Sequence, residues 1–259
     1  MYIYIYDNFV NQKKYESILA RIETRITDLG LNGKITRLSI MSSLADTMKN
    51  ELKKGAKTIV IVGDDSTLNK AISVLAGFIA DNSCFKKIPL GFIPINKKNN
   101  TIAEYLGLGH NESACDMLST RRIKTLDLGL VSDNYFLTQA NINTKNTIIE
   151  IDSTYSIEIS EPGEINIINL PIIKSLPKNF DINAQDGALD LFIKTKASKN
   201  IFFNKKNSSE QSVFSFKKLN ILNKYSPLIL DNTLKVKCPA TIKLADEKIN
   251  LIVGKKRLF

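Results

Sequence analysis

The sequence predicts two domains, a doubly wound α/β domain with a parallel sheet over residues 1–122 and an all-β sandwich domain over residues 123–259. Two observations support this fold class. Residues 58–62 form a continuous β-branched run, which is typical of a strand buried on both faces of a parallel sheet. Strand and helix patterns alternate as far as residue 121, and only short strand patterns follow.

The expected elements of the first domain follow one another in regular order. Strands are expected at residues 2–6, 35–40, 58–62 and 90–95, and helices at residues 15–29, 44–54, from residue 68, and at 102–108. Apolar residues lie on one face of the helix over 15–29, and Gly55 ends the helix over 44–54. Such alternation favours right-handed crossovers between parallel strands.

The second domain is predicted from short strand patterns that turn residues separate. These patterns cover residues 126–130, 135–137, 147–151, 155–159, 165–170, 188–194, 213–222, 228–230, 234–238, 241–244 and 249–253. Turn signals such as Glu161-Pro162-Gly163 and Asp231-Asn232 lie between them. Closely spaced short strands of this kind are typical of a sandwich.

The net charge and the cysteine content limit which partners the protein could bind and which metal or catalytic sites it could contain. The formal charge of +10 favours an anionic partner, namely a nucleotide, anionic lipid headgroups or nucleic acid, although scattered lysines also fit an ordinary solvated surface. Three widely separated cysteines and a single histidine, His110, argue against a zinc site and a histidine triad, and they indicate a reducing compartment. No nucleic-acid partner is expected, and the sequence leaves a homodimer open.

The chain begins directly with a strand pattern, without a basic segment or a long apolar segment before it. The longest apolar runs, such as residues 74–80, are too short to cross a bilayer. We therefore expect a soluble cytoplasmic protein that can touch a membrane surface peripherally.

The strand at residues 58–62 ends in a polar turn, Gly63-Asp64-Asp65-Ser66-Thr67, and a helical pattern begins directly after it. In open α/β sheets, ligands bind beyond the carboxyl ends of the strands, where the free N–H groups of a helix start attract phosphate. An ordinary βα turn with Asp or Ser as the N-cap residue gives the same pattern. The turn by itself leaves both interpretations open.

This stretch resembles the GGDGTLNE signature that diacylglycerol kinases, related lipid kinases and NAD kinases share. The residues that match it are Gly63, Asp65, Thr67, Leu68 and Asn69. Asp64 and Ser66 stand where the signature has glycines, and Lys70 stands where it has glutamate.

Further segments resemble the same family in the same order along the chain. Residues 89–94 resemble the strand that precedes the family's GTGNDFA loop, and residues 102–108 resemble the helix that follows this loop. Residues 122–129 resemble the segment in which the family's chain enters its second domain. Residues 183–190, with the sequence NAQDGALD, are the most specific match, and Asn169 lies upstream of them as in the family. The resemblance runs almost from end to end, and it implies the diacylglycerol kinase-like fold with ATP-dependent phosphoryl transfer to a lipid hydroxyl.

The resemblance also implies roles for particular residues. The nucleotide-binding positions are Gly63, Asp65, Ser66, Thr67 and Asn69, together with Ser39, Lys97 and Asn99. Asp186, with the backbone carbonyls of Asn183 and Ala188, matches a structural magnesium site of bacterial lipid kinases, although a plain Asp-Gly turn fits these residues equally well. Asp65 and Asp231 are the catalytic candidates, and the expected cofactors are ATP and Mg²⁺.

The motifs depart from the family where phosphate should bind. Residues 7–11 and 96–101 stand in place of two further phosphate loops, and neither stretch contains a glycine. Aligned through Cys238-Pro239, the family's catalytic DGE turn becomes Asp231-Asn232-Thr233, so its glutamate is missing. Glycines let the backbone approach phosphate closely, and phosphoryl transfer depends on such positioning. We therefore expect diacylglycerol phosphorylation to be very slow or absent.

Three functions stay open at this point. The first is a lipid kinase, and the second is a non-catalytic relative that binds a nucleotide or a lipid. The third is an NAD kinase-like enzyme in which Asp65 serves as the base. The lost glycines favour the second function, and the DG-x-LD segment at residues 186–190 argues against the third.

Overall fold

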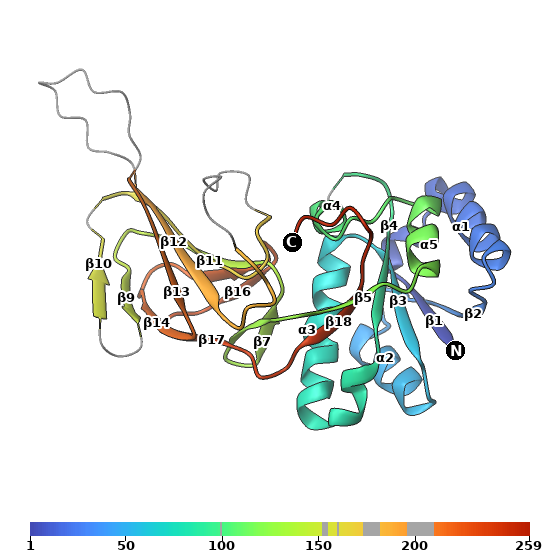
Figure 1. Cartoon of the computed structure of the whole chain (residues 1–259), viewed down its shortest axis with the longest axis horizontal. Coiled ribbons are helices and arrows are strands. Elements are labelled where there is room, and N and C mark those ends of the chain that lie inside the picture. Colours follow the sequence, from blue (N-terminus) through green and yellow to red (C-terminus); the bar gives the residue numbers. More distant parts are fainter. Residues whose placement is uncertain (99, 152–154, 160, 173–181, 196–209) are drawn as a thin grey trace, which may run out of the picture. The chain divides into compact units, whose positions relative to one another are not determined.

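The computed structural model describes residues 1–98, 100–151, 155–159, 161–172, 182–195 and 210–259. The chain divides into two compact units, which are drawn in Figure 1. Unit 1 consists of Met1–Leu126 and Glu247–Phe259, and unit 2 consists of Asp127–Asp246. In the described residues, no helix is long and apolar enough to cross a membrane.

Unit 1 is built on a sheet to which six strands contribute in the described residues, in the order β2-β1-β3-β4-β18-β5. The strands are β1 (Tyr2–Tyr6), β2 (Gly33–Arg37), β3 (Thr58–Gly63), β4 (Leu90–Pro94), β5 (Ile123–Leu126) and β18 (Ile249–Ile252). Neighbouring strands run parallel except at β5, which is antiparallel to β18. The parallel sheet that the sequence predicts is therefore confirmed.

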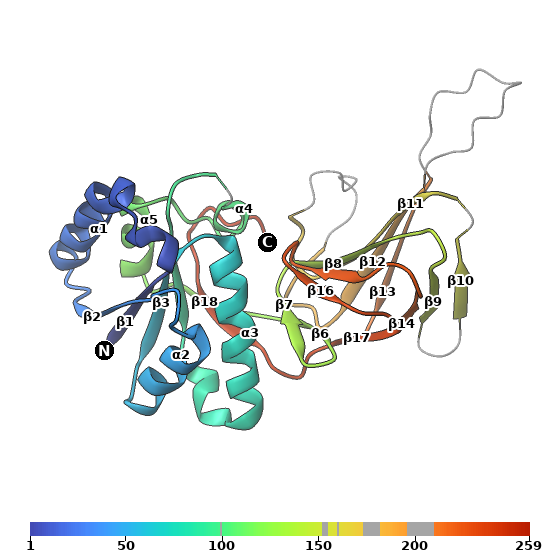
Figure 2. The same ribbon diagram turned by 180° about the vertical axis from the view of Figure 1, so that it is seen from behind.

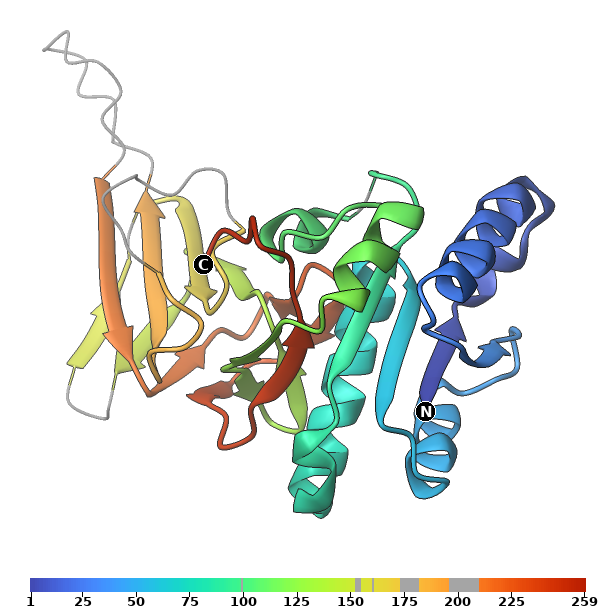
Figure 3. The same cartoon turned by 45° about the vertical axis from the view of Figure 1, so that its right-hand side comes forward.

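Helices cover both faces of this sheet, as Figure 3 shows. The helical segments are α1 (Glu16–Asp28), α2 (Leu44–Lys53), α3 (Asp65–Asp81), α4 (Thr101–Tyr105) and α5 (Glu112–Ser119), with the short 3-10 helices η1 (Asn8–Asn11), η2 (Lys13–Tyr15) and η3 (Ser83–Lys87). Helices α1 and α5 pack on each other, and α2 packs on α3. Alternate strand residues such as Tyr4, Val60 and Val62 share one apolar cluster with α1 and α5, so that the intervening residues face the other way.

Unit 2 contains two antiparallel sheets, which Figure 2 shows from behind. In the described residues their strand orders are β10-β9-β14-β17-β6-β7 and β13-β12-β11-β8-β15-β16. The strands are β6 (Gly129–Val131), β7 (Asn134–Phe136), β8 (Gln139–Asn143), β9 (Ile148–Ile151), β10 (Tyr155–Glu158), β11 (Gly163–Ile168), β12 (Leu189–Thr195), β13 (Glu210–Phe216), β14 (Lys218–Leu222), β15 (Leu228–Leu230), β16 (Leu234–Val236) and β17 (Ala240–Leu244).

One apolar core joins the two sheets of unit 2. It contains Ile149 and Ile242 from the first sheet and Ile167 and Leu191 from the second, all buried. Residues of both sheets share this core because each strand turns its alternate side chains inward. The predicted all-β second domain is confirmed, and its sheets pack as a sandwich.

The division of the chain differs from the boundary that the sequence predicts after residue 122. Strands β5 and β18 complete the sheet of unit 1, whereas the sequence assigns both to the second domain. Ile249 and Ile252 are buried, as the apolar pattern indicates. The pattern identifies a buried strand but cannot say which sheet the strand joins, because strand pairing is not local in sequence.

Candidate functional site

The candidate nucleotide site lies at the carboxyl edge of the sheet in unit 1. Strands β1, β3 and β4 are neighbours in the order β1-β3-β4 and run parallel, so their carboxyl ends meet at this edge. The residues that follow them are Asp7, Asp64 and Ile95. The N–H group of Asp7 donates to the carbonyl of Val62 (3.0 Å), so Asp7 stands directly beside the end of β3.

Asp64 is the N-cap residue of α3. Its carboxylate accepts the backbone N–H of Thr67 at 3.0 Å, and the Thr67 hydroxyl lies 3.1 Å from the same oxygen. That hydroxyl also donates to the carboxylate of Asp7. The buried Thr67 side chain therefore lies between two carboxylates, and a hydroxyl has one hydrogen to share between them.

Asp65 connects two helices. Its carboxylate accepts the backbone N–H of Ile102, in the first turn of α4, at 3.0 Å. Ser66, which follows it in the first turn of α3, is half-buried. The Asp64 and Asp65 carboxylates thus each bind an N–H group in the first turn of a helix, where phosphate could otherwise bind.

Gly63 packs closely against its neighbours. A Cβ atom at this position would lie 3.1 Å from the Thr67 hydroxyl oxygen and 3.3 Å from the Cβ atom of Asp7. The glycine therefore allows the ends of β1 and β3 and the start of α3 to approach one another. Asn69, one turn further along α3, is buried.

The connection after β4 is closed by a side chain that the sequence interpretation missed. The Asn100 amide donates to the carbonyls of Ile95 (3.0 Å) and Asn96 (2.7 Å), and the Asn100 residue is 1% exposed. Asn96 has a left-handed backbone (φ 63°), and its N–H donates to the Asn111 side chain. Asparagine tolerates this conformation better than most residues, so it can stand in for glycine in the fold of the loop.

The other predicted nucleotide-binding residues at this edge are exposed or not described. Lys97 forms an ion pair with Glu104, with a distance of 3.6 Å between Nζ and Oε1. Ser39 follows β2, and its hydroxyl oxygen lies 2.7 Å from that of Ser42. Asn99 lies outside the described residues. Asp7, in contrast, is not among the site residues that the sequence predicts, although it follows the first strand directly, as phosphate-binding residues often do in open α/β sheets.

The predicted catalytic residue Asp231 is buried in unit 2. Its carboxylate accepts the backbone N–H groups of Leu137 (3.0 Å), Thr138 (2.8 Å) and Gln139 (3.1 Å), as well as the Thr138 hydroxyl (2.5 Å). Burial raises the pKa of the Asp231 carboxyl, and these hydrogen bonds oppose that shift because they stabilise the charged form. Four donors therefore already bind the carboxylate, which holds the connection between β7 and β8.

Asp231 and Asn232 form the turn between β15 and β16, and both have left-handed backbones (φ 47° and 58°). The N–H group of Thr233 closes the turn by donating to the carbonyl of Leu230 (2.9 Å). Two consecutive left-handed residues are typical of a type I′ hairpin turn. Thr233 therefore occupies the end of a tight turn, at the position where the family has its glutamate.

The predicted metal residues form a compact turn before β12. The Asp186 carboxylate accepts the N–H of Ala188 (3.0 Å), and the N–H of Asp186 points to the carbonyl of Asn183 (3.3 Å). Asp186 and Asn183 are both exposed. In the part of the chain that the structure describes, no cluster of three His, Cys, Asp or Glu residues suitable for a metal ion is found.

The segments of unit 2 that resemble the family converge on one buried polar network. The Asp127 carboxylate accepts the N–H of Gly187 (2.9 Å), next to the Asp186 turn. The Asn169 side chain donates to the carbonyls of Asp127 (2.8 Å) and Leu137 (2.7 Å). Leu137 in turn donates its N–H to Asp231. These hydrogen bonds hold the four segments of unit 2 together, which is a structural role.

Comparison with known families and structures tests the resemblance directly. A family model described as the diacylglycerol kinase catalytic domain matches residues 2–131, which is half of the chain. A comparison with curated proteins finds no match.

Solved structures share the fold. Crystal structures from Bacillus anthracis str. Sterne, of a protein named as a diacylglycerol kinase (provisionally in one case), align with TM-scores of 0.76 and 0.74. Each alignment covers 99% of this chain and 98% of the other, at 17% sequence identity. At this identity the likeness concerns the fold alone. The match of the family model over residues 2–131 shows that this chain belongs to the diacylglycerol kinase catalytic domain family.

Proposed function

We propose that this chain is a member of the diacylglycerol kinase family in which phosphoryl transfer from ATP to a lipid hydroxyl is very slow or absent. One observation carries the proposal. The Thr67 and Ile102 N–H groups, at the starts of α3 and α4, are already bound by the carboxylates of Asp64 and Asp65.

The residues around the 63–69 turn do not fit the phosphates of ATP. A triphosphate binds to free N–H groups at helix starts and to glycine-rich backbone that side chains do not obstruct. Here Asp7 and Asp64 place two carboxylates around Thr67, and Gly63 is enclosed by its neighbours. An anionic ligand would have to displace these carboxylates and would lie close to like charge.

The residues available for acid–base chemistry support the same conclusion. A general base must reach the proton that it removes, and losing such a group typically lowers the rate by about 10²–10⁴. Thr233 stands in place of the glutamate, and the Asp231 carboxylate is buried with four donors. Neither side chain is suited to take a proton from a lipid hydroxyl.

A divalent metal fits the Asp186 turn better than ATP fits the 63–69 turn. The exposed Asp186 carboxylate and the Asn183 carbonyl are oxygen donors, which Mg²⁺ prefers, and Mg²⁺ usually keeps several waters. The Asn183 carbonyl accepts one N–H, and a carbonyl oxygen has a second lone pair. An ion bound there would stiffen the turn before β12.

A slow but genuine lipid kinase is the second candidate. It is favoured by the retention of Gly63, Asp65 and Thr67, and by the exposed Lys97, which could contact phosphate by charge. The NAD kinase-like alternative would instead use Asp65 as a base. That role conflicts with the hydrogen bond from the Ile102 N–H to the Asp65 carboxylate.

The deciding experiment combines binding with turnover. We expect no heat of binding and no thermal shift with millimolar ATP or ADP plus Mg²⁺, and no phosphorylation of diacylglycerol in mixed micelles or of NAD. The triple variant Asp64→Gly, Ser66→Gly, Thr233→Glu restores three family residues and should bind the nucleotide more tightly than the natural chain. Robust phosphorylation of a lipid hydroxyl by the natural chain would overturn the proposal, and phosphorylation of NAD would select the third function.

A further inference from the structure

We propose that the loop between β2 and α2 docks unit 1 on an anionic lipid bilayer, with Ile40 and Met41 inserted at the headgroup boundary. Both side chains are almost entirely exposed, Ile40 at 90% and Met41 at 97%. They are adjacent in sequence and more exposed than the other large apolar residues described in unit 1, among which Leu258 is 61% exposed and Met1 53%.

The loop presents these two side chains on a closed turn. The N–H of Ser42 donates to the carbonyl of Ser39 (3.1 Å), and the two serine hydroxyl oxygens lie 2.7 Å apart. Ile40 and Met41 are therefore the central residues of a four-residue turn, a position where Gly, Pro, Asn, Asp and Ser dominate. Ser43 then caps α2 by accepting the N–H of Asp46 (3.2 Å). Two large apolar residues thus stand at a tip that hydrogen bonds hold in shape.

Cationic side chains accompany this apolar tip. The connection after β1 carries the exposed Lys13 and Lys14, and the Asn11 side chain donates to the carbonyl of Leu38 (2.8 Å). Strands β1 and β2 are parallel neighbours, so the two connections leave the sheet at the same edge. The two connections, residues 7–15 and 38–43, contain these two lysines and one acidic residue, Asp7, whose carboxylate accepts hydrogen bonds from Phe9 and Thr67.

An anionic bilayer fits this surface better than a second protein chain does. A specific protein interface needs about 20–30 residues on each side, and two apolar side chains supply a small part of that. Interfacial docking needs only a few apolar groups that enter the headgroup region, together with nearby cations that attract anionic lipids. A second copy would bring the same lysines and the same formal charge of +10.

This inference goes beyond the proposed function and does not depend on it. Docking uses residues of the β1 and β2 connections, whereas the loss of phosphoryl transfer is argued from Asp64, Asp65 and Thr233. A chain that binds vesicles and fails to phosphorylate lipid supports both conclusions. A chain that phosphorylates lipid and still needs Ile40 to bind vesicles supports the inference alone.

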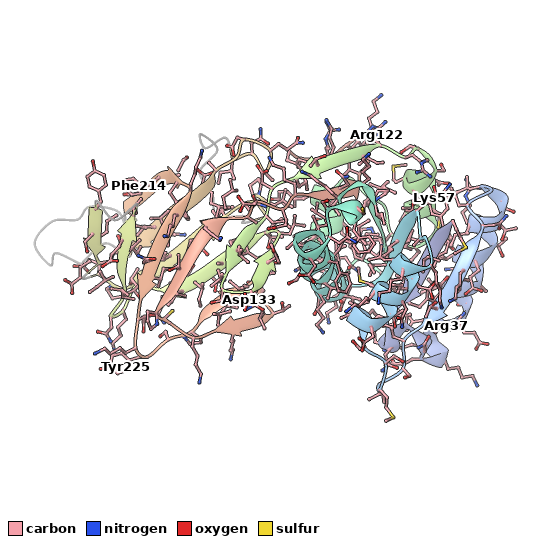
Figure 4. All side chains as sticks on the ribbon, turned by 90° about the horizontal axis from the view of Figure 1, so that it is seen from below. Arg37, Lys57, Arg122, Asp133, Phe214 and Tyr225 are labelled. Carbon is pink, nitrogen blue, oxygen red and sulfur yellow. The ribbon has the colours of Figure 1, made fainter. Side chains whose placement is uncertain are left out.

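Sedimentation with vesicles tests the inference. We expect the chain to bind vesicles of phosphatidylcholine mixed with phosphatidylglycerol, and the double variant Ile40→Ser, Met41→Ser to bind at least about tenfold more weakly. The variant Lys13→Gln, Lys14→Gln should lose roughly tenfold on these vesicles, and high salt should weaken its binding less than it weakens the binding of the natural chain. The control is Phe214→Ser, Tyr225→Ser, which changes two exposed residues of unit 2, at 43% and 79% exposure (Figure 4), and should bind as the natural chain does.

Fluorescence gives a direct second readout. The chain contains eight tyrosines and no tryptophan, so Met41→Trp introduces a single tryptophan at the tip. Its emission should shift to the blue when the mixed vesicles are added, whereas Tyr225→Trp should show no shift. Vesicle binding that is unchanged in the Ile40→Ser, Met41→Ser variant, or no shift for Met41→Trp, would overturn the inference. A concentration-dependent dimer that the same double variant abolishes would assign the tip to a second copy instead.

Discussion

At the scale of single residues, the carboxylates of this chain bind its own backbone. Asp64, Asp65 and Asp231 each accept backbone N–H groups, and the Asp7 carboxylate accepts the N–H of Phe9 (3.1 Å). Hydrogen bonds of this kind are stronger than those between neutral groups. The aspartates that the family motifs mark as functional therefore stabilise the backbone of this protein.

Asp231 gives the sharpest prediction of this kind. Asp231→Asn keeps the shape of the side chain and tolerates the left-handed backbone, but it turns one acceptor oxygen into a donor. We expect the free energy of unfolding to fall by about 1–3 kcal/mol, measured by urea denaturation. The matched control is Asp133→Asn, an exposed residue labelled in Figure 4, which should leave that free energy almost unchanged. Equal stability of the natural chain and Asp231→Asn would show that these hydrogen bonds are not needed for folding.

Asp186 can be tested by metal addition. If its turn holds Mg²⁺, adding the ion should raise the melting temperature of the natural chain in proportion to the logarithm of metal concentration. Asp186→Asn should lose that response, and Asp133→Asn should retain it. Melting curves that coincide with Mg²⁺ and with a chelator would identify the plain Asp-Gly turn.

At the scale of elements, the starts of α3 and α4 depend on neighbouring aspartates. Asp64→Ala should lower the free energy of unfolding by about 0.5–2 kcal/mol, because the N–H of Thr67 loses its cap. Asp64→Ser should recover most of this loss, and Asp64→Gly should cost only a few tenths of a kcal/mol. Urea denaturation of the three variants measures their free energies of unfolding and so ranks them. A loss as large in Asp64→Ser as in Asp64→Ala would contradict the capping role.

The sequence predicts elements well where their pattern is local. Residues 58–62 are β-branched throughout and form the buried strand β3, and the helical spacing after Leu68 lies within α3. The hydrogen-bond partners of Asp65 and Asp231 could not be predicted, because Ile102 and Leu137 are distant in sequence. A motif identifies the residues that lie at the carboxyl edge, but only the fold shows which donors reach them.

At the scale of the whole chain, unit 2 is inserted between β5 and β18 of unit 1. Its two ends lie together, since the N–H of Ala245 donates to the carbonyl of Leu128 (2.8 Å). It also has an apolar core of its own. We therefore expect a fragment of residues 127–246 to fold alone, with a cooperative thermal transition monitored by circular dichroism. A fragment without such a transition would show that unit 2 needs unit 1.

Fragments of unit 1 test whether this unit needs β5 and β18 in order to fold. A fragment of residues 1–122 lacks β5 and β18, so it should expose the edge of β4 and aggregate on size exclusion. Because Leu126 lies opposite Ile249, residues 1–126 joined by a short glycine linker to residues 247–259 should instead give a soluble, folded unit. A folded 1–122 fragment would contradict the need for these two strands.

The position of β18 also has a consequence for synthesis of the chain. On the ribosome, residues 249–252 emerge after the whole of unit 2, although they lie between β4 and β5 in the sheet of unit 1. Domains usually fold in order from the N-terminus. In this chain, all residues of unit 2 are synthesised before the last residues of unit 1. A chain whose translation stops before residue 249 therefore leaves the ribosome with an open strand edge for chaperones and proteases to detect. The sheet of unit 1 can be completed only after residue 252 has been translated.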